Sequence, residues 1–247
     1  MTDYNCYVMS KQEKAKYTVA AAIFLFTVGL IFFSNGLIAV VFSLGAFFYP
    51  RYKCIDLIKR RKIELNLQFK DALYSLASAL GVGRSLESSF KVALKDLQVL
   101  YPDDETFIVS EFKLICRRLE LNEPVESGLL DLARRSGLED ISNFVDIMVI
   151  CKRTGGNMVE VVKNTSNIIC EKIDLNQDID LLLTKQKYEQ KILNFMPVVF
   201  IGLIKFGGSG YMDVLYSSAQ GYLIMAFALI ILAASYFISK KILNIRV

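Results

Sequence analysis

The sequence predicts an all-α integral membrane protein in which two transmembrane hairpins flank a cytoplasmic bundle of roughly six helices. Uncharged apolar stretches lie toward both ends of the chain, over residues 17–50, 192–204 and 214–239. The residues between them, 51–190, are charged and repeat their apolar positions at helical spacing. The predicted domains are an N-terminal tail and hairpin (1–50), a cytoplasmic helical domain (51–190), and a C-terminal hairpin with a short tail (191–247).

The composition agrees with this division. Of 247 residues, 53% are hydrophobic, and the mean hydropathy is +0.39, which is unusual for a soluble protein. The net charge is +4, and basic residues gather beside the apolar stretches. Topology and anionic lipid account for a basic collar at a membrane face. We therefore predict membrane lipid as a partner and no nucleic acid.

The first apolar stretch, 17–50, is too long for one ordinary crossing of about 20 residues. The turn residues Ser34-Asn35-Gly36 divide it near its centre. Two helices of about 16 residues reach roughly 24 Å, a little less than the ~30 Å hydrocarbon core. We therefore expect a tight hairpin with snorkelling lysines and local thinning of the bilayer. One long, tilted helix is the alternative.

The charges on the flanks favour the hairpin. Its turn carries no charge, and both of its flanks are basic. These residues are Lys11, Lys14 and Lys16 before the hairpin and Arg51, Lys53, Lys59, Arg60, Arg61 and Lys62 after it. The positive-inside rule places both flanks in the cytoplasm. The apolar stretch is also too long for the core of a secretory signal, so we expect a retained anchor.

The C-terminal hairpin follows the same logic. Its first crossing, 192–204, is short and contains Pro197, so we expect it to extend into Phe206 with Lys205 snorkelling to the outer interface. Its second crossing, 221–239, is rich in Leu, Ile, Ala and Phe. Between them, 211–218 could form a short interfacial helix outside. We predict a multi-pass protein of the cytoplasmic (inner) membrane, with both termini and the central domain in the cytoplasm.

Within the central domain, apolar spacing and punctuation predict six helices. Glycines, serine and proline at the corners should end or begin them. These helix-corner residues are Gly81, Gly83, Ser85, Pro124, Gly155 and Gly156. The first two expected helices are 52–80 and 86–97. The third is capped by Asp103 and runs to Leu121, and the fourth has Pro124 in its first turn and ends at Gly137. The fifth is 138–153, and the sixth is capped by Asn157 and continues toward the membrane.

Residues that could carry chemistry are few. The segment Gly81-Val82-Gly83-Arg84-Ser85 lacks the spacing of a phosphate-binding loop. The chain has no histidine, which excludes catalytic triads and Cys–His pairs. Its five cysteines are widely spaced, which indicates free thiols in a reducing compartment. The apolar spans contain no acidic residue, which disfavours an ion-coupled transporter. We predict no enzyme, no cofactor and no metal.

Two arginine doublets stand out in the acidic part of the central domain. They are Arg117-Arg118 and Arg134-Arg135. One interpretation is salt bridging within the domain. The other is a docking surface for a protein partner, because arginine is favoured at interfaces.

Two segments of the central domain resemble a known family. They are FKDALYSLASALGVGRSLESSFKVAL (69–94) and EPVESGLLDLARRSGLEDISNFVDIMVICKRTGGNMVEVVKNTSNII (123–169). Both resemble the F-domain of the inner-membrane platform proteins of type II secretion systems and type IV pili. A single such domain with two crossings on each side resembles the TadB/TadC-like platform proteins of Tad (Flp) pili. Ser89-Phe90 and Glu123 stand where the family usually has Ala-Leu and glycine.

The resemblance implies a non-enzymatic platform protein. Such proteins sit above a hexameric secretion ATPase and take part in moving pilin subunits from the membrane into a filament. The implied partners are that ATPase, a sibling platform protein in a homo- or hetero-oligomer, and pilin subunits. The alternative is a membrane-anchored helical scaffold or signalling protein unrelated to pili.

Overall fold

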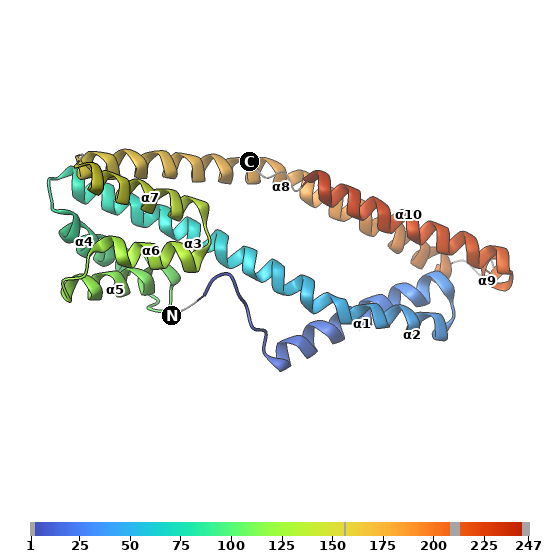
Figure 1. Ribbon diagram of the computed structural model, residues 1–247. Coiled ribbons are helices and arrows are strands. Elements are labelled where there is room, and N and C mark those ends of the chain that lie inside the picture. Colours follow the sequence, from blue (N-terminus) through green and yellow to red (C-terminus); the bar gives the residue numbers. More distant parts are fainter. Residues whose placement is uncertain (1–2, 156, 208–212, 244–247) are drawn as a thin grey trace. The chain divides into compact units, whose positions relative to one another are not determined.

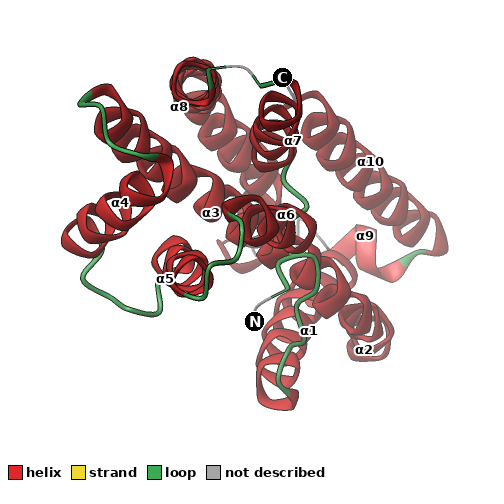
Figure 2. Cartoon of the chain, turned by 60° about the vertical axis from the view of Figure 1, so that its left-hand side comes forward, coloured by secondary structure: helices red, strands yellow, loops and turns green. Residues whose placement is uncertain are grey.

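The computed structural model describes residues 3–155, 157–207 and 213–243. Figure 1 follows the chain from its N-terminus in blue to its C-terminus in red. In the described residues every regular element is helical (Figure 2). The chain forms two compact units: unit 1 comprises Met1–Val8 and Ile55–Gln177, and unit 2 comprises Met9–Cys54 and Asp178–Val247. The described residues Asp3–Val8 thus belong with the central domain.

Unit 1 is a helical body. Its elements are the main part of α3 (Tyr49–Gly81), α4 (Leu86–Leu100), α5 (Phe107–Glu120), α6 (Val125–Ser136), α7 (Glu139–Thr154) and the first part of α8 (Met158–Gly207). A single core joins them, with Phe69 of α3 packed edge-on against Phe144 of α7 at 5.8 Å between ring centres. The ring centres of Phe90 in α4 and Phe112 in α5 lie 5.5 Å apart. These aromatic side chains are almost fully buried and supply much of the apolar area that holds the body together.

Glycine, serine and proline lie at the corners of unit 1. Gly83, Gly137 and Gly155 adopt positive φ angles of 82°, 56° and 73°, a backbone conformation that glycine adopts without a steric penalty. Ser85 caps α4, its side chain accepting the Ser88 N–H at 3.3 Å. Pro124 is the N-cap residue of α6, one position before the predicted first turn. Gly81 is the last residue of α3, and Gly156 lies outside the described residues.

The predicted start of the third body helix was wrong. Helix α5 begins at Phe107 with Thr106 as its N-cap residue, four residues after Asp103. The Asp103 carboxylate instead accepts the N–H of Glu105 at 2.9 Å. An Asp side chain that bonds to the backbone two residues on forms an Asx turn, which competes with helix capping for the same residue.

Unit 2 contains the apolar helices. These are α1 (Lys11–Phe33), α2 (Gly36–Leu44), the 3-10 helix η1 (Gly45–Phe48), the end of α8, the short α9 (Asp213–Ser217), and α10 (Ala219–Leu243). The predicted turn lies between α1 and α2: Ser34 has a φ of 49°, and the Asn35 side chain accepts the Leu37 N–H at 3.0 Å. At the crossing of these helices, a Cβ atom on Gly29 would lie 2.9 Å from Cα of Ala39. The backbones of α1 and α2 are therefore in close contact where Gly29 lies beside Ala39.

Two long helices contribute residues to both units. The prediction separated the second crossing from the first body helix, but α2, η1 and α3 follow one another directly, with Pro50 tolerated in the first turn of α3. Helix α8 runs for 50 residues through Pro197, so the last body helix and the third apolar stretch are one element. Its end includes Lys205, whose Nζ donates to the Leu30 carbonyl at 2.5 Å and so caps the C-terminus of α1.

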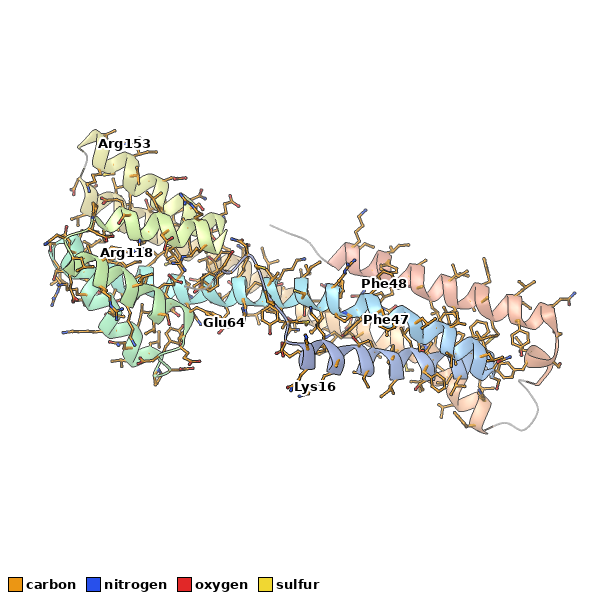
Figure 3. The ribbon with its side chains drawn as sticks, turned by 60° about the horizontal axis from the view of Figure 1, so that its bottom comes forward. Lys16, Phe47, Phe48, Glu64, Arg118 and Arg153 are labelled. Carbon is orange, nitrogen blue, oxygen red and sulfur yellow. The ribbon has the colours of Figure 1, made fainter. Side chains whose placement is uncertain are left out.

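Four helices in the described residues are long and apolar enough to cross a membrane. They include Lys11–Phe33, the continuous stretch Gly36–Gly81, Val159–Gly207 and Gln220–Ser239. Much of their apolar surface is uncovered: Phe47 and Phe48 on η1, labelled in Figure 3, are 72% and 73% exposed. Large apolar surface of this kind marks a site that meets lipid or another protein.

Candidate functional site

Both arginine doublets lie in the last turn of a helix. Arg117 and Arg118 end α5, and Arg134 and Arg135 end α6, which packs beside it. Positive charges at the C-terminus of a helix interact favourably with the negative end of the helix dipole. Successive residues on a helix point about 100° apart, so one arginine of each doublet can turn inward while the other faces solvent.

The inner arginines, Arg118 and Arg135, form one charged network. The Arg135 guanidinium donates twice to the Glu111 carboxylate, at 2.6 and 2.5 Å, and once to Asp131 at 3.1 Å. Arg118 (Figure 3) reaches the same Asp131 at 3.5 Å. The side chains of Glu111 and Arg135 are only 6% and 13% exposed. Hydrogen bonding to Glu111 raises the pKa of Arg135 above its usual range. These two arginines therefore hold α5 and α6 together.

The outer arginines, Arg117 and Arg134, are exposed. Neither side chain makes an ion pair with another residue in the described part of the chain. Each presents an unpaired guanidinium group to solvent in the last turn of its own helix, and we call the two residues the arginine pair. Each can bind a carboxylate with two parallel hydrogen bonds, which suits an acidic protein surface.

Sequence reasoning missed a further member of the inner network, Tyr4. Its hydroxyl donates to Glu111 at 2.9 Å, and its ring packs edge-on against Phe107 with 5.5 Å between ring centres. The Tyr4 side chain is 1% exposed. The next residue, Asn5, donates to the carbonyls of Arg134 and Arg135 at 3.3 and 3.0 Å, and so caps the end of α6. Because 107 positions separate Tyr4 from Glu111, no local pattern signals this contact.

The buried Tyr4 and the partly buried Tyr101 predict how unit 1 responds to alkaline pH. Burial is the main cause that raises the pKa of Tyr4 and Tyr101 far above the ordinary value of about 10, and the Glu111 and Asp71 carboxylates raise it further. The folded state therefore keeps protons that the unfolded chain releases. The stability that these groups contribute is complete below about pH 10 and is lost as the pH rises above it.

We expect part of the tyrosinate absorbance to appear only at the pH at which circular dichroism shows loss of helix, because Tyr4 and Tyr101 keep their protons until the body unfolds. The variant with both Tyr4→Phe and Tyr101→Phe should lack that part. An unchanged absorbance step on unfolding of this variant would show that other groups govern alkaline unfolding.

Residues suited to a metal or to redox chemistry do not gather in the described residues. No group of three Cys, Asp or Glu side chains there is placed to hold a metal ion. The five cysteines are free thiols, of which Cys6 is exposed and Cys116 is buried. Burial raises the pKa of the Cys116 thiol to about 11, which leaves little reactive thiolate at neutral pH.

Comparisons with models of known families, with curated proteins and with solved structures found no match to this chain. The functional argument therefore rests on the helices, the network and the arginine pair.

Proposed function

We propose that this chain is an inner-membrane platform protein of a Tad/type IV pilus-like or type II secretion-like machine, which couples a cytoplasmic secretion ATPase to pilin assembly. The observation that carries the proposal is one all-helical body placed in sequence between two pairs of apolar helices. This order fits a protein that passes movement between a soluble motor and the membrane. The resemblance of residues 69–94 and 123–169 to the F-domain supports the same assignment.

The exposed apolar side chains of unit 2 support membrane insertion, because such surface is unfavourable in water and favourable in contact with lipid. The docking of Tyr4 supports the direction of insertion. Residues before α1 and residues after α2 contribute to one unit, which supports a topology with both on one side of the bilayer. The chain between them then crosses an even number of times, as a hairpin does. The basic flanks favour the cytoplasm as that side.

The ATPase contact in this proposal is the arginine pair. Arg117 and Arg134 are the members of the doublets that are exposed, whereas Arg118 and Arg135 are engaged within the body. The apolar helices would contact lipid, a sibling platform protein and pilin subunits. A helical body whose helices pack on one continuous core is suited to transmit force.

The test reverses the charge of the arginine pair. The variant with both Arg117→Glu and Arg134→Glu should insert normally but lose the secretion ATPase that co-purifies with the full chain from detergent-solubilised membranes of the cells that express it. Lys95→Glu on α4 is the matched control, since Lys95 is also exposed and makes no ion pair in the described residues. Unchanged recovery of the ATPase would reject the arginine pair as its contact.

A membrane-anchored scaffold or signalling protein is the second candidate, favoured by the same helical body. Co-purification separates the two. A platform protein should bring down a secretion ATPase and pilins, whereas a scaffold unrelated to pili should bring down neither.

A further inference from the structure

The first residues of the chain are fastened to the body by several contacts. We call Asp3–Tyr7 the N-terminal strap. Besides the contacts of Tyr4 and Asn5 with α5 and α6, the backbone N–H of Tyr4 donates to the Arg135 carbonyl at 3.1 Å. Lys62 of α3 donates to the Asn5 side chain at 2.6 Å. The Arg61 guanidinium lies 4.3 Å from the centre of the Tyr7 ring. The strap therefore touches three helices of unit 1.

Each charged body group that holds the strap also has a partner within the body. Glu111 accepts from Tyr4 but also from Arg135. Lys62 donates to Asn5 but also to the Gly137 carbonyl at 3.3 Å. Arg61 lies over the Tyr7 ring and also 6.0 Å from the centre of the Phe107 ring. If the strap leaves, none of these groups becomes a buried charge without a partner, which is the state that makes removal of a contact most costly.

The strap itself is built for local movement. It contains no helix or strand, and the residue after it, Val8, is 85% exposed. A cavity of about 380 Å³ lies beside Tyr4, lined also by Arg61, Asp104, Glu105, Phe107 and Ser110. Segments with few buried apolar contacts and no regular structure open at lower free energy than the core. The strap has one fully buried side chain, whereas α3 has many.

Docking of the strap shortens the connection between the body and the first apolar helix. Only residues 6–10 separate Asn5 from Lys11, where α1 begins. A link of this length extends to about 20 Å at most. While the strap is docked, movement of the start of α1 away from the end of α6 is limited to that reach. When the strap is released, this limit disappears and α3 and α8 remain the connections.

We propose that the N-terminal strap is a releasable latch: its docking on α5 and α6 restrains the body relative to the first apolar helix, and its release frees that movement while the body stays folded. The latch does not depend on the identity of the partner that the arginine pair binds. It gives the chain two states, restrained and free, that differ in the position of one short segment.

Hydrogen–deuterium exchange of the full chain in detergent tests the latch. In the unmodified chain, the amide of Tyr4 should exchange more slowly than in a free peptide and faster than the core amides of α3, such as those of Leu73 and Leu76. In Tyr4→Ala, exchange at position 4 should become at least about tenfold faster while the α3 core is unchanged. Cys6→Ala is the matched control, because the Cys6 side chain is exposed and should leave every rate unchanged.

Three results would overturn the proposal. An amide of Tyr4 that exchanges as fast as a free peptide means that the strap does not dock. One that exchanges only together with the α3 core means that the strap is a permanent part of the body. Equal acceleration of the whole body in Tyr4→Ala means that the body does not stay folded without the docked Tyr4, so that the strap is not a latch.

Discussion

Replacing Arg135 with alanine should lower the free energy of unfolding of the helical body by about 3–5 kcal/mol, which is the usual cost of removing one partner of a buried ion pair. The change leaves the Glu111 carboxylate, 6% exposed, without the two hydrogen bonds that Arg135 donates. It also removes one of the two arginines that bind Asp131. Thermal unfolding of the full chain in detergent, followed by circular dichroism, measures the effect.

The neighbouring residue supplies the control. Arg134→Ala removes the same charge from the same helix turn, but its side chain is exposed, so we expect a change within about 0.5 kcal/mol. The double variant with Glu111→Gln and Arg135→Met, which removes both charges, should recover part of the loss. If Arg135→Ala and Arg134→Ala destabilise the body equally, the Glu111–Arg135 pair is not a structural centre.

Replacing Gly29 with leucine should prevent close packing of α1 on α2. Even a single Cβ atom at position 29 would meet the Ala39 backbone at 2.9 Å, and a backbone atom cannot move aside as the end of a flexible side chain can. Overpacking of this kind costs about 1–3 kcal/mol and sometimes more. We expect the variant to insert but to be cut by protease in the hairpin when reconstituted in lipid vesicles, because the two helices must separate.

Gly36→Leu is the matched control for the hairpin. Gly36 begins α2, is exposed, and has no atom within 4 Å of the position of a Cβ. The same side chain there adds apolar surface without a clash, so protease resistance should be unchanged. Equal resistance of the Gly29→Leu variant would mean that α1 and α2 do not cross at this glycine.

Local chemistry explains which parts of the fold could be predicted. The positive φ angles at Gly83, Gly137 and Gly155 follow from the freedom of glycine, and the turn at 34–36 follows from its own residues. The start of α5 was mispredicted because Asp103 and Thr106 are both capping residue types, and only the structure shows that Asp103 bonds to Glu105. The prediction that α2 and α3 are separate helices failed because Pro50 lies in the first turn of α3, where a proline removes no helical hydrogen bond.

The candidate site could be predicted only in outline. Composition drew attention to the arginine doublets, but a doublet gives no indication of which member faces the body. That choice depends on Glu111 and Asp131, which lie on different helices. The contribution of Tyr4 could not be foreseen at all, since it depends on a contact across 107 positions.

The position of Tyr4 in the chain imposes an order on its biosynthesis. The ribosome makes Tyr4 long before Glu111 and the end of α6. The residues that contact the Tyr4 side chain therefore do not yet exist when α1 and α2 emerge. In the proposed topology, the first residues remain during that interval on the side of the bilayer where translation continues. Closing of the strap over α6 is thus a late event, and a chain whose leading segment is translocated by mistake cannot complete it.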